Sequence, residues 1–194
     1  FNGDGYSADW HEEAERRGLL NLRTTLDALA TLRDQKNLDL FAKYAIMSHR
    51  ELESRAEIFV EQYFKTVNIE GEMTAEMART MVLPSAVRYL DDLLDAYHNY
   101  AQLVGASEKG KAKGLGKLVE DLNSTINELV LALDGLDAQN AELGGDDVHS
   151  KAFHVRDNVI PAMTAVRAAC DRLERMVPDD LWPLPRYREM LFIR

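Results

Sequence analysis

The sequence is poor in the residues that mark several large classes of protein. One cysteine in 194 residues rules out an internal disulfide framework and fits a reducing compartment, so we expect a cytoplasmic protein. Only five prolines interrupt the chain. No apolar run approaches the roughly 20 residues that a membrane span needs. These absences argue against a disulfide-rich secreted module and against a membrane protein.

Basic residues are also in deficit, with 23 Lys and Arg against 33 Asp and Glu and a net charge of −10. This balance works against nucleic acid and anionic membranes as partners. The apolar share of 46% and the charged share of 29% are typical of a soluble globular protein. We expect one domain with its own core over residues 1–194. The chain begins with Phe1, so the lack of a signal peptide says little about targeting.

The pattern that is present is helical, and no strand-like alternation extends beyond a few residues. In residues 1–47 we predict short helices. The first begins at Ser7, a good N-cap, and ends before Gly18, a good residue to follow a helix. Asn21 is the predicted cap of a second helix, whose apolar face holds Leu22, Leu26, Leu29 and Leu32.

Residues 48–105 predict one long helix that opens with a capping box between Ser48 and Glu51. Pro84 predicts a kink in it, and Gly71 is the second candidate for a bend. Apolar residues recur along it at helical spacing: Leu52, Ala56, Phe59, Tyr63, Val67, then Met73, Met77, Met81, then Val87, Leu90, Leu94, Tyr97, Ala101 and Val104.

Two more long helices follow a loop at residues 105–114. The first carries a heptad seam of Leu115, Leu122, Leu129 and Leu136 with Leu118, Ile126 and Leu133 between them. A break at residues 144–147 precedes the second, with an aspartate as its cap. Its stripe is Val155, Val159, Met163, Val166, Cys170, Leu173 and Val177, with a kink expected at Pro161 and an end at Pro178.

The predicted fold is therefore all-α. We expect an elongated antiparallel bundle of three long helices over residues 48–178, preceded by short helices in 1–47. A proline-containing tail at residues 179–194 is expected to dock. No internal repeat is recognised.

Candidate chemical sites are weak. Asp95 with His98, and Asp146 with His149, have a metal-like spacing but lack inward glutamates, so we interpret them as solvated or capping residues. His11 with Glu15, and His49 with Glu53, are i, i+4 pairs that more often stabilise a helix face. Residues 2–5 predict a turn rather than a calcium loop. We predict no catalytic, cofactor-binding or metal-binding residue.

Three further features have a functional and a structural interpretation. The lysines and glycines of residues 105–117 could hold an anion, but their spacing is not that of a P-loop and favours a solvated hairpin tip. Met73, Met77 and Met81 could line a binding groove, but core filler is the commoner use of methionine. Cys170 lies on an apolar stripe and is interpreted as a small core residue rather than a catalytic thiol.

The last thirteen residues read WPLPRYREMLFIR. Pro183 and Pro185 fix an extended course and end any preceding helix. A terminus so rich in apolar residues is expected to pack onto the bundle or a neighbouring domain, through Trp182, Tyr187 and Phe192.

This tail closely resembles the carboxyl end of type III glutamine synthetases. Residues 1–11 with 15–22, and residues 48–55 with 61–63 and 65–70, resemble the same family. In the tail, Arg186 stands where a threonine is common and Arg194 where a lysine is common, and both changes suit a helix or solvent. The loosest match is between residues 105 and 145.

The resemblance implies a fragment of a larger enzyme that joins ammonia to glutamate using ATP and Mg²⁺ or Mn²⁺. In that family the catalytic residues belong to an upstream domain, so none is carried over to this chain. The implied partners are that upstream domain and a ring-shaped homo-oligomer, expected to be a dodecamer. We expect the segment to be inactive alone and to serve assembly or support. The alternative is an independent helical interaction module.

Overall fold

The structure is a computed structural model that describes residues 2–104 and 113–191. Within these ranges every regular element is a helix, so the predicted all-α fold is confirmed. The chain divides into two compact units, one of Phe1–Lys65 with Asp147–Phe153 and one of Thr66–Asp146 with His154–Arg194. The boundary between the units falls inside a long helix rather than near residue 47. The single-domain organisation stays a prediction.

The first unit contains short helices and the start of a long one. They are α1 (Ala8–Arg16), α2 (Thr25–Ala30), the 3₁₀ turn η1 (Thr31–Arg33), α3 (Gln35–Lys43), the first part of α4 (His49–Met77) and most of α7 (Val148–His154). Its core is built from three of these helices, with Leu26, Val60 and Ala152 buried together. Leu29, Tyr63, Phe64 and Val148 pack against them.

Local capping sets the helix limits in this unit. The Ser7 side chain accepts a hydrogen bond from the Trp10 amide, and Gly18 ends α1 in the left-handed region at φ 70°, as predicted. The predicted cap at Asn21 is wrong. An N-cap needs an extended backbone, but Asn21 has φ 44°, and Thr24 caps α2 instead.

The capping box at the start of α4 is confirmed. The Ser48 amide and hydroxyl both donate to Glu51 Oε2 at 2.8 Å, and the Glu51 amide donates back to Ser48 Oγ at 3.3 Å. These hydrogen bonds, with a smaller contribution from the charge of Arg55, lower the pKa of Glu51.

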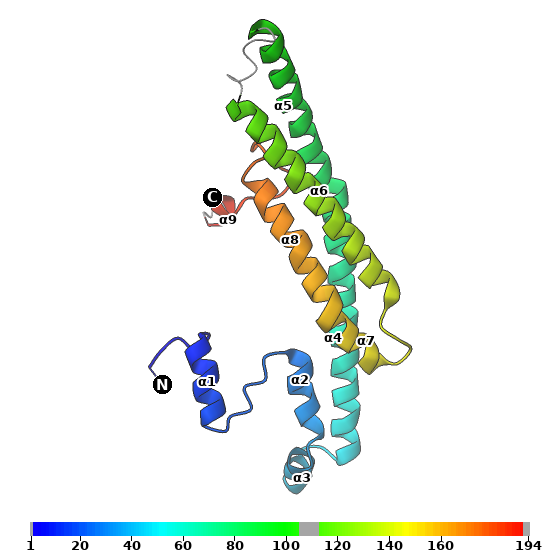
Figure 1. Ribbon diagram of the computed structural model, residues 1–194. Coiled ribbons are helices and arrows are strands. Elements are labelled where there is room, and N and C mark those ends of the chain that lie inside the picture. The colour runs from blue at the N-terminus through cyan, green and yellow to red at the C-terminus, as the bar shows by residue number, and fades with distance from the viewer. Residues whose placement is uncertain (1, 105–112, 192–194) are drawn as a thin grey trace. The chain divides into compact units, whose positions relative to one another are not determined.

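The second unit contains three long helical stretches. The rest of α4 runs through a π-helical turn, η2 (Ala78–Val82), into α5 (Leu83–Val104), and α6 (Lys113–Glu142) follows. The third stretch passes through a second π-helical turn, η4 (Val155–Val159), into α8 (Ile160–Glu174), and the short α9 (Tyr187–Met190) lies in the tail. In Figure 1, α5, α6 and α8 lie side by side and alternate in direction, as predicted for the bundle.

The leucine seam of α6 is confirmed in most positions, since Leu122, Ile126, Leu129, Leu133 and Leu136 are buried. Leu118 is exposed. The lysine and glycine loop is shorter than predicted, because residues 113–117 belong to α6 and Lys117 pairs with Asp121. The rest of that loop lies outside the described residues. The predicted aspartate cap of α7 is confirmed, with Asp147 Oδ1 accepting from the amides of His149 and Ser150 at 3.0 Å.

Both prolines inside the long helices follow a π-helical turn that ends two residues before them. The Leu83 amide bonds to the carbonyl of Ala78 and the Ile160 amide to that of Val155, each five residues back. Proline cannot donate a hydrogen bond to the carbonyl four residues back, and the proline ring clashes with that carbonyl. The wider turn moves that carbonyl aside. The bends expected at Pro84 and Pro161 therefore take the form of π turns.

These two turns also reveal a short repeat that we did not recognise in the sequence. Residues 78–84 read ARTMVLP and residues 155–161 read VRDNVIP, with arginine, valine and proline at matching positions. The same local sequence thus gives the same departure from the α-helix in two different helices.

Small residues form the buried side of α4 in the second unit. A Cβ added to Gly71 would lie 2.7 Å from Asn140 Oδ1 and 2.8 Å from Val159 Cγ1, so this glycine permits a close helix contact. It lies in regular α-helix, and the bend considered there is wrong. The predicted apolar stripe is also wrong in part, since the structure buries Ala75, Ala78, Val82 and Ala86 and exposes Phe59, Met73, Met77, Val87 and Leu94.

Candidate docking site of the C-terminal tail

The tail leaves α8 through a turn at Pro178. The amides of Leu181 and Trp182 donate to the Pro178 carbonyl at 3.2 and 3.0 Å, which reverses the chain. The two prolines then carry it without regular structure to Arg186, whose amide donates to Glu189 Oε2 at 3.1 Å and opens α9. Figure 1 shows the tail returning beside α8.

Arg186 holds the tail to the end of α8. Its Nη1 donates to the Glu174 carbonyl at 2.8 Å and its Nη2 to the Val177 carbonyl at 2.6 Å. Its Nε lies 2.6 Å from Asp179 Oδ1. Only 18% of the side chain is exposed, so of the two settings expected for Arg186, a helix or solvent, the structure shows the first, at the start of α9. The last carbonyls of a helix lack intrahelical partners, and the guanidinium of Arg186 satisfies that of Glu174 together with the Val177 carbonyl in the turn after α8.

A groove of about 870 Å³ opens between the tail and the helices of the second unit. Its walls are α4 with η2, α8, and the tail itself. Trp182 and Leu184 are half-buried and line it, and the docking expected of Trp182 stays a prediction. The side chain of Tyr187 and all of Phe192 lie outside the described residues. The apolar lining includes Met77, Met163, Cys170, Trp182, Leu184 and Met190.

The rim of the groove is charged and partly paired. Glu70, Asp171 and Glu174 line it, and Arg167 Nε lies 2.7 Å from Asp171 Oδ1. Met77 was predicted to be core filler but is an exposed wall of this groove. The surface here is suited to holding apolar side chains.

Cys170 is half-buried in the groove wall. Burial, with a smaller contribution from the charge of Asp171, raises the pKa of its thiol to about 11. A catalytic thiol needs a lowered pKa, because the thiolate is the nucleophile. The structural interpretation of this cysteine is therefore supported.

The paired residues considered as metal ligands have other partners. His149 Nε2 lies 3.1 Å from Glu57 Oε2, and Arg33 pairs with the same carboxylate. These residues form an ion-pair cluster on the surface. Its hydrogen bonds, mainly the one from His149, lower the pKa of Glu57. His98 contacts Gln102, His11 contacts Asn21, and His49 lies 3.6 Å from Asp39.

The turn predicted at residues 2–5 lies slightly later, over Asp4–Ser7, where the Ser7 amide donates to the Asp4 carbonyl at 3.1 Å and the Tyr6 amide to Asp4 Oδ1 at 2.9 Å. In residues 2–104 and 113–191 no three His, Cys, Asp or Glu side chains are grouped to hold a metal ion. None of the helices described is both long and apolar enough to cross a membrane.

Sequence reasoning missed Arg186 because a single charged residue near a terminus carries no pattern. The signal available was its place two residues beyond Pro183-Leu184, where the chain must turn back toward the free carbonyls of a helix end.

Comparison with known proteins was made along the whole chain. A family model described as "Glutamine synthetase C-terminal domain" matches residues 1–101. The type-3 glutamine synthetase of Dictyostelium discoideum is 36% identical over 201 residues, which covers 100% of this chain and 27% of that protein. Glutamine synthetases of Bacteroides fragilis and Butyrivibrio fibrisolvens are 30% and 31% identical, again over 27% of their lengths.

The chain thus spans about a quarter of the length of the curated relatives that it matches, 27% in each case. The family match covers the Phe1–Lys65 part of the first unit and the start of the second, and the relatives extend the similarity through the tail. This chain belongs to the family of glutamine synthetase C-terminal domains, and its similarity extends to the type-3 enzymes.

Proposed function

We propose that this chain is the non-catalytic C-terminal domain of a glutamine synthetase, the enzyme that uses ATP to join ammonia to glutamate. The observation that carries the proposal is that the whole chain is similar to a segment making up 27% of the length of each of two proteins named glutamine synthetase. The domain supports the catalytic part of the enzyme or its assembly. The tail contributes by closing the bundle on itself through Arg186 and Trp182.

The chemistry of the reaction is assigned to the rest of the enzyme. ATP and Mg²⁺ or Mn²⁺ would bind there, since metal ions in phosphoryl transfer bridge phosphate oxygens from a cluster of acidic ligands. No such cluster lies in the part of the chain described here, so no step is derived from residues 1–194. The working enzyme is proposed to be a cytoplasmic ring, a dodecamer.

The test uses the longer enzyme with and without residues 1–194. The full enzyme is expected to form glutamine from glutamate, ammonia, ATP and Mg²⁺, and the isolated chain is expected to form none. Removal of the domain is expected to lower the number of subunits in the assembly, which mass photometry measures. Glutamine formation by the isolated chain would refute the proposal, and so would a full-length protein that forms none.

The second candidate is an independent interaction module. Exposure of Met73 and Met77 favours it, because flexible methionine surfaces suit partner binding. This alternative predicts that Met73→Ser with Met77→Ser abolishes binding to a separate protein while enzyme mass and activity stay unchanged. Loss of assembly in the same variant would favour the ligase domain.

A further inference from the structure

A hollow in the first unit lies along α4, next to and opposite the helix face that carries the buried residues. Leu52, Ala56 and Val60 are the buried residues of this segment. The hollow is lined by Ile46, Met47, Arg50, Arg55, Ile58 and Phe59, among others. At 100° per residue, Ile58 stands about 200° round the helix from Ala56 and is separate from the buried face, whereas Phe59, at about 300°, borders that face.

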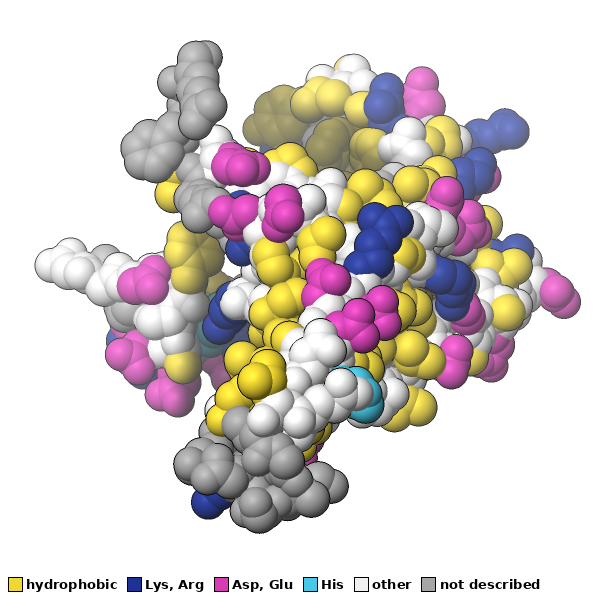
Figure 2. Space-filling view, turned by 90° about the horizontal axis from the view of Figure 1, so that it is seen from above, with side chains coloured by type: hydrophobic (Ala, Val, Ile, Leu, Met, Phe, Trp, Pro, Cys, Tyr) yellow, Lys and Arg dark blue, Asp and Glu magenta, His cyan; other side chains and the backbone are white. Residues whose placement is uncertain are grey.

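The floor of this hollow is apolar although it is not core. Ile46 is 62% exposed, Ile58 47% and Phe59 40%. A helix face opposite the core normally carries polar side chains, and apolar side chains gathered there mark an interaction surface. Figure 2 shows more widely how hydrophobic side chains reach the surface among charged ones.

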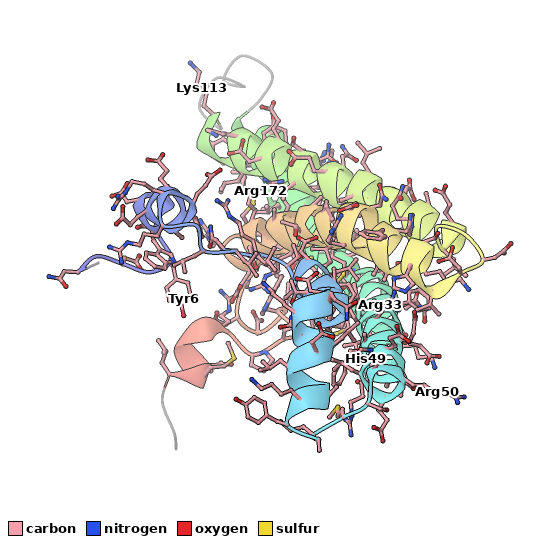
Figure 3. The ribbon with its side chains drawn as sticks, turned by 90° about the horizontal axis from the view of Figure 1, so that it is seen from below. Tyr6, Arg33, His49, Arg50, Lys113 and Arg172 are labelled. Atoms are coloured by element: carbon pink, nitrogen blue, oxygen red, sulfur yellow. The ribbon has the colours of Figure 1, made fainter. Side chains whose placement is uncertain are left out.

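Two arginines line this hollow without a direct ion pair in the described structure, although the charge of Arg55 contributes to lowering the pKa of Glu51. Arg50 and Arg55 are exposed, and Figure 3 shows Arg50 extending away from the first turn of α4. Glu51, the carboxylate that also lines the hollow, already accepts the Ser48 cap hydrogen bonds. Several other arginines pair with carboxylates, as in Arg33 with Glu57, Arg79 with Asp137 and Arg172 with Glu128.

We propose that this hollow binds a protein surface in which an apolar side chain is flanked by carboxylates, and that the surface belongs to the rest of the glutamine synthetase. The proposal rests on the proposed function, because the partner surface is assigned to the larger part of the enzyme. Guanidinium groups bind carboxylates through two parallel hydrogen bonds, and the apolar floor buries the side chain between them. Arginine, methionine and aromatic residues are enriched at such interfaces.

The local make-up of the hollow, and not the charge of the whole chain, favours this partner. The net charge of −10 opposes every anionic partner alike, whereas the hollow has two arginines against the one carboxylate of Glu51. A phosphate group would pair with the arginines but leave the exposed Ile46, Ile58 and Phe59 in water. Two arginines beside exposed aliphatic and aromatic side chains instead complement an acidic protein surface.

The experiment places the photo-crosslinker p-benzoylphenylalanine at Ile58 in the purified full-length enzyme. Irradiation is expected to join it to a peptide outside residues 1–194 that carries Asp or Glu near the attachment point. Leu131, on α6 and 71% exposed, is the control position. Arg50→Glu with Arg55→Glu is expected to lower the yield at Ile58 by about tenfold or more, and a lysine replacing the partner acid is expected to restore it.

Several results would overturn the inference. They are a yield at Ile58 no higher than at Leu131, no effect of the double charge reversal, attachment to a second copy of residues 1–194, or attachment to bound nucleic acid or lipid. Glutamine formation by the same wild-type preparation is measured in parallel. An inactive full-length protein refutes the proposed function, whereas an active enzyme without the crosslink refutes only the hollow as the docking surface.

Discussion

At the scale of single residues, the tight contact at Gly71 gives the most direct test of the packing in the second unit. A Cβ there would come within 2.8 Å or less of Asn140 and Val159, too close without a shift. Gly71→Ala is expected to destabilise the chain by about 1–3 kcal/mol, the usual range for overpacking. The free energy of unfolding in urea measures it.

Gly135 is the matched control, because nothing lies within 4 Å of an added Cβ in its place on α6. Gly135→Ala is expected to stabilise the chain by about 0.5–1 kcal/mol through helix propensity alone. The same substitution thus has opposite signs at two helical glycines. Stabilisation by Gly71→Ala would show that the two helices are not in close contact.

The buried thiol of Cys170 leads to a second prediction at this scale. Its pKa of about 11, against an ordinary value of 9.0, leaves about 100-fold less thiolate near pH 8 than in the unfolded chain. Alkylation by iodoacetamide at pH 8 is therefore expected to be slower by that factor in the folded protein than in denaturant. Equal rates would place Cys170 outside the groove wall.

At the scale of elements, the tail depends on Arg186. Arg186→Met keeps the aliphatic stem but removes both hydrogen bonds to the end of α8 and the pairing with Asp179. Hydrogen bonds from a charged donor contribute about 1.5–3 kcal/mol each, so the tail is expected to detach. Trp182 fluorescence should shift to the red and limited proteolysis should cut near residue 180. Arg175→Met, at an exposed position next to α8, should change neither.

The capping box of α4 gives a prediction on acid stability. The pKa of Glu51 is lowered from its ordinary 4.5 by the Ser48 hydrogen bonds, so its carboxylate stabilises the fold above pH 4.5 and this stabilisation is lost as the pH falls below it. Glu51→Gln is expected to lower the urea midpoint at pH 7 and to have a smaller effect at pH 3. The same difference in urea midpoint between wild type and Glu51→Gln at pH 7 and at pH 3 would contradict this.

The positions of the helices were largely predictable from the sequence, but which face of each helix is buried was not. Ser7, Ser48 and Asp147 carry cap chemistry that acts locally, so the helix starts that they set were found correctly. The buried side of α4 depends on close contact with other helices, which small residues allow. Weighting large apolar side chains therefore pointed to Phe59 and Met77, whereas Val60 and Ala78 are buried.

The site was predicted in kind and not in detail. Two prolines and the apolar residues after them predict a docked tail, and Trp182 of that tail lines the groove. The contacts of Arg186 depend on where the carbonyls of Glu174 and Val177 lie at and just after the end of α8. Those positions depend on the folded helix, and the sequence offers only the place of Arg186 after the two prolines as a signal.

At the scale of the whole molecule, the isolated chain is expected to be folded but catalytically silent. Each of its two units has buried apolar residues of its own, Leu26 and Val60 in one and Leu122 and Leu129 in the other. Far-UV circular dichroism of purified residues 1–194 is expected to show a dominantly helical spectrum with cooperative thermal loss. A largely unstructured spectrum would show that the domain needs the rest of the enzyme to fold.

The paired π turns before Pro84 and Pro161 constrain how this domain can change in length. A π turn accommodates one residue more than regular α-helix, so deleting one residue within it restores the ordinary bond pattern only if the proline is also replaced. Everything beyond the deletion would then rotate by about 100° about the helix axis. Ala78 and Val82 of one turn and Ile160 beside the other line the same groove. Single-residue insertions and deletions near either proline are thus tolerated far less well than substitutions, and viable length variants should change both helices together.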